Sequence, residues 1–183
     1  TGGRNVDTRS EECGILVLVH ERDEAPDPVI AKAVARLEAG GLKPRGLLQH
    51  GVPGCGKACA TLYLDDIGMQ RQVCIFEDRG SQARGCRLDT AGLTVAAGWL
   101  REAIEARPDV LFVNRFGRHE GEGRGLREEI ALAVAAGIPI VIAINRQYLR
   151  QWRAFAGETF ATLPLDAGEI ADWCRRAVAE VEA

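Results

Sequence analysis

Three continuous runs of apolar residues predict strands that are buried in the middle of a sheet. They span residues 14–19, 110–113 and 137–144, and a further short strand is expected at residues 45–49, directly after Pro44. Runs that are apolar throughout, instead of alternating, are typical of strands covered on both faces. The hydrophobic pattern therefore predicts a mainly parallel sheet inside an α/β fold.

Apolar residues spaced three and four positions apart predict five helices around this sheet. Each has a polar residue suited to its start or a glycine suited to its end. Their buried faces are expected to include Val134 in the third helix and Val181 in the last. The expected starts and ends are Asp27 with Pro28, Gly40-Gly41, Asp89 or Thr90, Gly137, Asn145, Gly157, and Asp166 with Glu169.

Two further patterns fix the expected topology. Alternating residues at 61–64 and 72–76, around a turn at 65–68, predict an antiparallel hairpin. The first strand, helix and second strand predict a right-handed crossover between two parallel strands that pair with each other. With a last short strand within residues 159–163, the chain is expected to form a three-layer α/β/α domain with a β-hairpin insertion.

Size and composition are those of one globular domain. The chain has 183 residues, 46% of them hydrophobic. The polar residues 1–12 are expected to form a flexible tail, not a signal peptide, and residues 13–183 a single domain. A formal net charge of −3 gives no electrostatic basis for nucleic-acid binding, and no run is long enough to insert into a membrane. The oligomeric state is left open.

The six cysteines are scattered along the chain. Cys55 and Cys59 are spaced C-x-x-x-C, but no second pair accompanies them, so the spacing does not favour a zinc site and no metal site is expected. Unpaired, scattered cysteines are typical of reduced proteins, which predicts a cytoplasmic location.

Residues 51–58, G-V-P-G-C-G-K-A, contain the glycines and the lysine of a phosphate-binding P-loop. Position 58 is Ala, so the hydroxyl that would hold Mg²⁺ is absent. The residues that follow alternate like a strand, whereas a P-loop opens a helix whose N-terminus binds phosphate. The pattern therefore favours a glycine-rich entry into the hairpin over a working P-loop.

The most unusual stretch is residues 109–125, D-V-L-F-V-N-R-F-G-R-H-E-G-E-G-R-G, where an apolar strand ends in arginines and glycines. Ligands of α/β proteins bind at the carboxyl ends of parallel strands. Guanidinium groups and glycine amides are suited to binding anions. The alternative is a solvated connection. The expected ligand-binding residues here are Asn114, Arg115, Gly117, Arg118, Glu120, Gly121, Gly123 and Arg124.

A second arginine-rich stretch, residues 77–90, precedes the second helix. It forms either a surface loop with a helix cap or the second wall of a shared anion pocket. In the latter case its ligand-binding residues are Ser81, Gln82, Arg84, Gly85 and Arg87. Cys86 lies between two of these arginines, which would lower the pKa of a thiolate nucleophile.

Together these stretches resemble a known bacterial family. S-Q-A-R-G-C-R-L-D at 81–89, N-R-F-G-R-H-E-G-E-G-R-G at 114–125 and G-I-P-I-V at 137–141 are similar to the domain of unknown function 2478, often encoded beside molybdenum ABC-transporter genes. The resemblance spans nearly the whole chain, as far as W-R-A-F-A-G at 152–157. It implies a fold and a connection with molybdenum, but no reaction.

The order of elements is also distantly similar to small P-loop nucleoside triphosphatases. In those enzymes the central strand ends in D-E-I-G-x-x-E, and the acidic pair positions Mg²⁺ and water. Here the same register holds Asn114 and Arg115, while Gly117 and Glu120 remain, and the first strand is followed by H-E-R-D-E-A-P-D-P without G-K-[ST]. The resemblance implies a P-loop-like fold with degenerate Walker motifs. Exchanging a carboxylate for a guanidinium favours a bare anion over a metal cation.

These observations favour a non-hydrolysing binding protein for a small oxyanion or phosphorylated ligand, with molybdate or a nucleotide as the candidates. The first alternative is an unusual Mg²⁺-dependent nucleoside triphosphatase or phosphotransferase, with Glu120 as general base and Lys57 or the arginines as phosphate ligands. The second is a non-catalytic partner of a molybdenum transport or cofactor protein, in which Glu120 holds arginines in place.

Overall fold

The computed structural model describes residues 14–53, 60–77 and 87–183, which form one sheet with helices on both faces. In chain order the elements are β1 Ile15–His20, α1 Pro26–Ala39, β2 Pro44–Pro53, β3 Ala60–Ile67, β4 Arg71–Glu77, β5 Arg87–Leu88, α2 Thr90–Glu105, β6 Val110–Phe116, α3 Arg118–Gly121, α4 Arg127–Ala135, β7 Ile140–Asn145, the 3-10 turn η2 Arg146–Tyr148, α5 Leu149–Ala156, β8 Ala161–Thr162 and α6 Ala167–Glu182.

The eight strands of the sheet lie in the order β5-β4-β3-β2-β6-β7-β1-β8. The five strands β2, β6, β7, β1 and β8 run parallel, whereas β3 pairs antiparallel with β2, and β4 pairs antiparallel with β3. The predicted hairpin is thus confirmed. Its turn is residues 68–70 instead of 65–68, because Asp65 and Asp66 pair within the ladder and Gly68 adopts the positive φ that the turn requires.

One topological prediction was wrong. The strands β1 and β2 are parallel, but they do not pair, because β6 and β7 lie between them. These two strands are apolar on both sides, with nearly every residue buried, so they occupy the centre of the sheet. The insertion brings the carboxyl ends of β1, β7 and β6 together at one edge.

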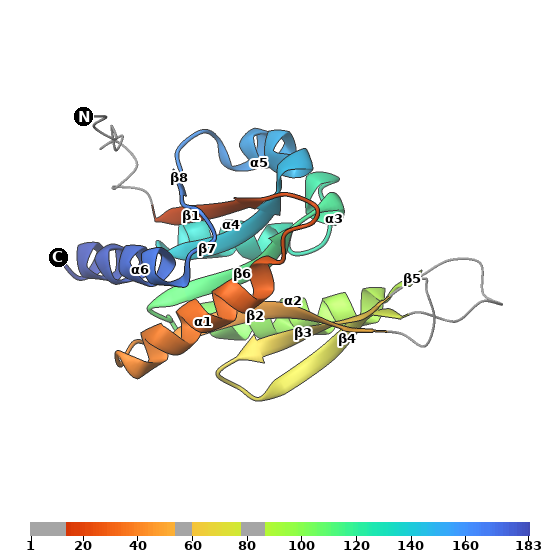
Figure 1. Ribbon diagram of the computed structural model, residues 1–183, viewed down its shortest axis with the longest axis horizontal. Helices are drawn as coiled ribbons and strands as arrows, with labels where there is room; N and C mark the ends of the chain where they lie inside the picture. The colour runs from red at the N-terminus through yellow and green to blue at the C-terminus, as the bar shows by residue number, and fades with distance from the viewer. Residues whose placement is uncertain (1–13, 54–59, 78–86) are drawn as a thin grey trace.

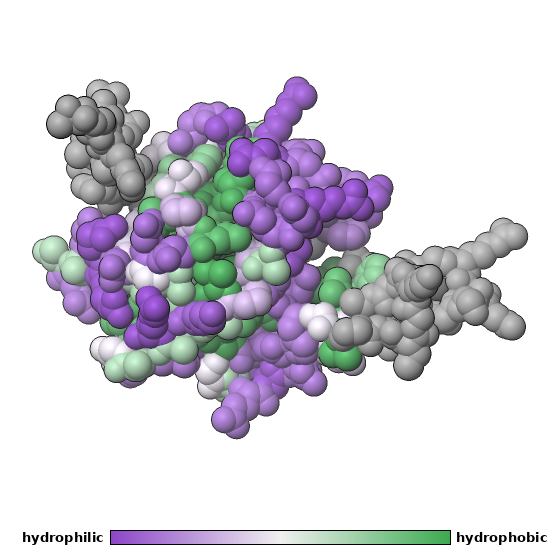
Figure 2. All heavy atoms as spheres, in the orientation of Figure 1, coloured by the Kyte–Doolittle hydropathy of each residue, from purple (hydrophilic) through white to green (hydrophobic). Residues whose placement is uncertain are grey.

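The three layers of the predicted α/β/α fold are visible in Figure 1, where α1 and α6 cover one face and α2 and α4 the other. One cluster of buried side chains joins α2, α4 and α5 to the sheet, and a second joins α1 and α6 to the opposite face. On the face with α1 and α6, hydrophilic side chains surround a narrow hydrophobic strip (Figure 2). Amphipathic helices therefore separate the core from solvent.

Most helix ends follow the sequence signals. The side chains of Asp89, Asn145 and Asp166 accept backbone N–H groups as N-caps. Asp27 is not an N-cap: α1 begins earlier, with Ala25 at that position, and Asp27 lies inside the first turn. Val134 and Val181, expected in buried faces, are 45% and 63% exposed. Helical spacing predicts which face of a helix is apolar, but it does not predict how much of that face a neighbouring element covers.

Residues 1–13 and 54–59 lie outside the described residues, and with them the predicted tail, most of the P-loop-like segment, and Cys55, Lys57 and Cys59. The strands on either side of 54–59 are antiparallel neighbours, with Pro53 opposite Ala60. Among the described helices, none is long and apolar enough to cross a membrane.

The contact between β2 and β6 depends on a glycine. Gly46 has a φ of +122°, and a Cβ at this position would lie 1.9 Å from the carbonyl oxygen of Phe112. Glycine therefore allows the two backbones to approach, as it does wherever a chain needs positive φ or close packing. At Gly98 in α2, by contrast, an added Cβ would have no neighbouring atom within 4 Å.

We predict that Gly46→Ala lowers the free energy of unfolding by about 2–4 kcal/mol, because overpacking and positive-φ strain each cost about 1–3 kcal/mol. The matched change Gly98→Ala should raise it by about 1 kcal/mol, because alanine is the better helix former. Urea unfolding of the two variants measures both effects. Equal stabilities would contradict the close approach of β2 and β6.

Candidate functional site

The candidate site lies where β6 ends and the loop to α4 begins. Strand β6 continues past the apolar run to Phe116, so Asn114 and Arg115 belong to the strand and not to the loop predicted after Val113. The following residues form the short helix α3 and a turn before α4. The edge of the sheet is the one at which α/β proteins bind ligands.

Asn114 and Arg115 both contact Asp27 of α1. The Asn114 Nδ2 donates to Asp27 Oδ1, and the Arg115 Nη2 donates to Asp27 Oδ2 at 3.0 Å. The Arg115 Nε also donates to Asn114 Oδ1 at 3.3 Å. Asp27 lies in the first turn of α1, where the helix dipole favours a negative charge. The carboxylate is therefore held between a helix N-terminus and two donors from the central strand.

Glu120 closes the loop after β6. It is 7% exposed; its Oε2 accepts the backbone N–H of Gly117 at 3.0 Å, and its Oε1 accepts that of Leu126 at 3.1 Å. Gly125 has a φ of +69°, and a Cβ there would lie 2.2 Å from Glu120 Oε1. The sequence suggested that Glu120 would act as a base or hold arginines. Its described hydrogen bonds are to backbone amides.

The loop glycines expected to offer amides to an anion use them within the protein. The N–H of Gly117 donates to Glu120, that of Gly121 to the carbonyl of Gly117 at 3.0 Å, and that of Gly123 to the carbonyl of Glu120 at 3.1 Å. These bonds wind α3 and its following turn. In this conformation the anion-binding capacity of the loop therefore rests on its side chains.

Arg118 and Arg124 share one carboxylate at the surface. Arg118 Nε lies 2.9 Å from Glu122 Oε1, and Arg124 Nη2 lies 2.5 Å from Glu122 Oε2. The hydrogen bond from Arg118, followed by that from Arg124, lowers the pKa of Glu122. The same contact with Glu122 raises the pKa of Arg118. The two arginine side chains are 75% and 68% exposed, so solvent screens both pairs.

A cavity of about 150 Å³ lies beside this loop. The hairpin β3–β4 supplies an apolar wall that includes Leu62, Leu64 and Ile75. The other lining residues are Phe76, Leu93 and Leu126, which are apolar, and Gln49, Asn114, Arg115, Gly117, Arg118, His119 and Glu120. The predicted Gly121, Gly123 and Arg124 are not among its lining residues.

Gln49 and His119 were not predicted as site residues, although both line the cavity. Gln49 is the polar residue that follows the apolar part of β2, and β2 pairs with β6, which brings Gln49 close to Asn114. A polar residue directly after the apolar part of a strand that pairs with β6 is therefore the signal that would have found it. His119 lies inside the arginine-rich stretch, beside the predicted Arg118.

Whether the second arginine-rich stretch reaches this cavity stays a prediction. Ser81, Gln82, Arg84, Gly85 and Cys86 lie outside the described residues. The backbone of Arg87 pairs with Glu77 in β5, the outermost strand on that side. Four strand-to-strand steps of about 4.8 Å separate β5 from β6, about 19 Å in total. Strand β4, which pairs with β5, nevertheless lines the cavity through Ile75 and Phe76, so a ligand shared by the two stretches stays a prediction.

The structure bears on metal and thiol chemistry only in the part of the chain that it describes, which does not include the predicted nucleophile Cys86. There, no group of three or more His, Cys, Asp and Glu residues is arranged to hold a metal ion. Of the two cysteines with described surroundings, Cys174 is buried in α6, and burial raises the pKa of its thiol to about 12. A thiol with that pKa is protonated at neutral pH and is a poor nucleophile.

We predict that Glu120→Gln lowers the free energy of unfolding by about 1–3 kcal/mol, because the amide nitrogen of glutamine cannot accept the N–H that one carboxylate oxygen accepts now. The control Glu122→Gln should change stability much less, since Glu122 pairs with exposed arginines. Urea unfolding compares the two. A Glu120→Gln variant as stable as the Glu122→Gln variant would show that Glu120 does not hold the loop.

This chain is similar in fold to one known protein and in sequence to another. The fold is similar to the solution structure of a human cancer-related nucleoside triphosphatase, with a TM-score of 0.62 and 14% identity, over 91% of this chain and 96% of that one. The sequence is 30% identical, over 162 residues, to the molybdenum import ATP-binding protein ModC 2 of Bradyrhizobium diazoefficiens.

The alignment with ModC 2 covers 88% of this chain but only 18% of that protein, so the chain matches a small part of its relative. The likeness to the human enzyme confirms the predicted P-loop-like fold, as a likeness of fold alone. Residues 15–173, nearly all of the chain, match the sequence model of one family. The chain therefore belongs to the family described as Protein of unknown function (DUF2478).

Proposed function

We propose that this protein binds a small oxyanion or phosphorylated ligand at the carboxyl end of β6 and does not hydrolyse it. The observation that carries the proposal is the pair Asn114 and Arg115, which stand at the end of the central strand and hold the Asp27 carboxylate. Carboxylates and tetrahedral oxyanions are bound by the same amide and guanidinium donors. The residues at this edge are thus suited to anions.

Donors remain for an external ligand. Arg115 has five N–H groups, and its described hydrogen bonds come from Nε and Nη2. Arg118 and His119 also line the cavity. Among the described residues, Arg118 forms an ion pair only with Glu122, and exposed pairs of this kind contribute little to stability. An anion of higher charge can therefore take the place of Glu122 as the partner of Arg118.

The same residues argue against hydrolysis. Phosphoryl transfer in P-loop enzymes requires Mg²⁺ bound by protein groups and a residue that orients the attacking water. Here the oxygens of Asp27 accept from Asn114 and Arg115, and those of Glu120 accept from backbone amides. No metal-binding cluster occurs among the residues described. We therefore expect the protein to bind its ligand without hydrolysing it.

The size of the cavity and the relatives guide the choice of ligand. About 150 Å³ accommodates a single oxyanion or one phosphate group more readily than a whole nucleotide. Molybdate is the first oxyanion to test, because ModC 2 is described as a molybdenum import protein. A nucleotide that inserts only its phosphate is the next, because the fold is similar to that of a nucleoside triphosphatase.

We predict that isothermal titration calorimetry detects binding of molybdate, tungstate, phosphate or a nucleotide, and that Arg115→Ala weakens it at least tenfold, a loss of about 1.4 kcal/mol or more. Arg176→Ala is the matched control, since Arg176 is an exposed arginine of α6, on the face opposite α2 and α4. The affinity of the Arg176→Ala variant for the ligand should equal that of the unmodified protein.

Other outcomes would replace the proposal. Nucleotide binding that requires Mg²⁺, with release of phosphate, would make the protein a hydrolase. No binding across the panel would contradict anion binding and favour the protein-partner hypothesis, in which the arginines contact an acidic surface of a molybdenum transport or cofactor protein. If Arg115→Ala leaves the affinity for the ligand unchanged, the ligand binds elsewhere and not at the end of β6.

A further inference from the structure

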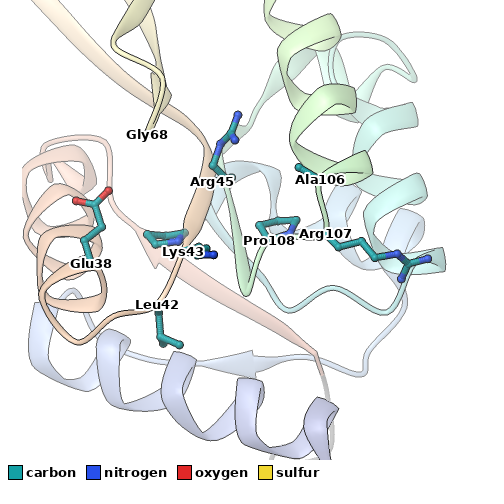
Figure 3. Close-up of a pocket in the computed structure, with 9 residues that line it drawn as sticks. Glu38, Leu42, Lys43, Arg45, Gly68, Ala106, Arg107 and Pro108 are labelled. Atoms are coloured by element: carbon teal, nitrogen blue, oxygen red, sulfur yellow. The ribbon is translucent and has the colours of Figure 1, made fainter.

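A second and larger hollow lies at the opposite edge of the sheet, where β2 and β6 begin. It has a volume of about 340 Å³ and lies between the end of α1, the β3–β4 turn and the end of α2 (Figure 3). Ligand pockets in proteins range from about 300 to 1,000 Å³. The cavity is therefore large enough for a compact organic molecule, and it shares no lining residue with the cavity beside β6.

The lining of this hollow is cationic, although the chain as a whole has a formal charge of −3. Lys43, Arg45 and Arg107 are among its lining residues, and Glu38 is the one carboxylate that accompanies them. Figure 3 shows the Arg107 side chain extending away from Arg45, so direct contact with a ligand falls to Lys43 and Arg45. Local positive charge in a concave site attracts anions.

Arg45 is oriented by a buried carboxylate without being fully bound to it. Its Nη2 lies 3.9 Å from Asp66 Oδ1, beyond hydrogen-bond distance, and the side chain of Asp66 is 1% exposed. The other oxygen of Asp66 accepts from Arg71 Nε at 2.6 Å. The Nε of Arg45 is buried and has no hydrogen-bond partner in the described structure.

Asp66 Oδ1, which lies 3.9 Å from Arg45 Nη2, is likewise buried without a hydrogen-bond partner, and a ligand in the hollow would reach neither this oxygen nor the buried Nε. The negative charge of Asp66 attracts the Arg45 guanidinium and orients it. The turn at Gly68 packs against the Arg45 side chain, since a Cβ at Gly68 would lie 3.4 Å from Arg45 Cδ. The guanidinium is therefore held in place with hydrogen-bonding capacity to spare. The Arg45 side chain is 20% exposed, and an anionic ligand would contact this exposed part.

Lys43 has a fixed backbone and an uncommitted ammonium group. Its N–H donates to Asp109 Oδ2 at 2.6 Å, and the Asp109 N–H donates back to the Lys43 carbonyl at 3.2 Å. Within the described residues, the exposed Lys43 side chain forms no ion pair. The apolar surface between the cations comes from Leu42, Pro44 and Pro108.

We propose that this hollow is a second binding site, for a small organic anion that carries one carboxylate or phosphate group on a compact apolar body. Arg45 and Lys43 bind the anionic group, and the leucine and the two prolines contact the body. The site is independent of the one proposed at β6, because the two lie at opposite edges of the sheet and use different residues.

The test is a ¹H–¹⁵N NMR titration of the full chain with benzoate and with phenyl phosphate, with benzyl alcohol as a neutral probe of similar size. We expect saturable shifts of the Lys43, Arg45 and Gly68 amides with at least one of the two anions and none with the alcohol. Which anion binds more tightly identifies the ligand as a carboxylate or a phosphate ester. No saturable shift, or equal binding of the alcohol, would overturn the proposal.

Matched variants connect the shifts to the cations. Lys43→Met should weaken binding at least fivefold, whereas Lys32→Met, which removes an exposed lysine from α1, should leave it unchanged. Both positions are exposed, so both variants are expected to fold, and Arg45→Met adds a second test if its spectrum remains dispersed. Arg115→Ala should not affect these shifts. Equal affinities of Lys43→Met and Lys32→Met would overturn the assignment.

Discussion

The buried polar groups at the end of β6 must find hydrogen-bond partners, and the candidate site depends on how they do so. Asn114 is 2% exposed and Glu120 is 7% exposed, at the point where an apolar strand reaches the edge of the sheet. Leaving such groups without partners would cost more than a hydrogen bond contributes. Asp27 provides an acceptor for Asn114, and two backbone amides donate to Glu120.

This network changes the chemistry that the fold can support. The same architecture occurs in a human nucleoside triphosphatase, but here the charges at the end of the central strand are arranged as internal pairs of arginine with carboxylate. Such pairs leave spare guanidinium donors and few free carboxylate oxygens. This composition supports our proposal that the site binds an anion without Mg²⁺, which prefers oxygen ligands.

The two edges of the sheet use their cations differently. At the carboxyl edge, Arg115, Arg118 and Arg124 each contact a carboxylate, so an external anion must share or replace a partner. At the amino edge, Arg45 is directed by a buried carboxylate to which it is not hydrogen-bonded, and its side chain lines a larger hollow. This difference is the reason why we propose two separate anion sites on one sheet, each with its own arginine.

The candidate site was predicted in part. Three of the residues expected to bind a ligand, Asn114, Arg115 and Arg118, line the cavity beside β6, and their binding of a ligand stays a prediction. The roles of individual residues were not predictable. Glu120 binds backbone amides, and Gly121 and Gly123 use their N–H groups within the loop, because these contacts depend on how α3 winds.

By itself the sequence determined most of the elements and several of their ends, because hydrophobic runs and cap residues such as Asp89, Asn145 and Asp166 are local signals. The tertiary structure alone decided which strands pair and which side chains meet. Asp27 binds Asn114 across 87 positions of the chain, because β6 and β7 insert between β1 and β2. That insertion follows from packing the most apolar strands at the centre, a property of the whole sheet and not of any one segment.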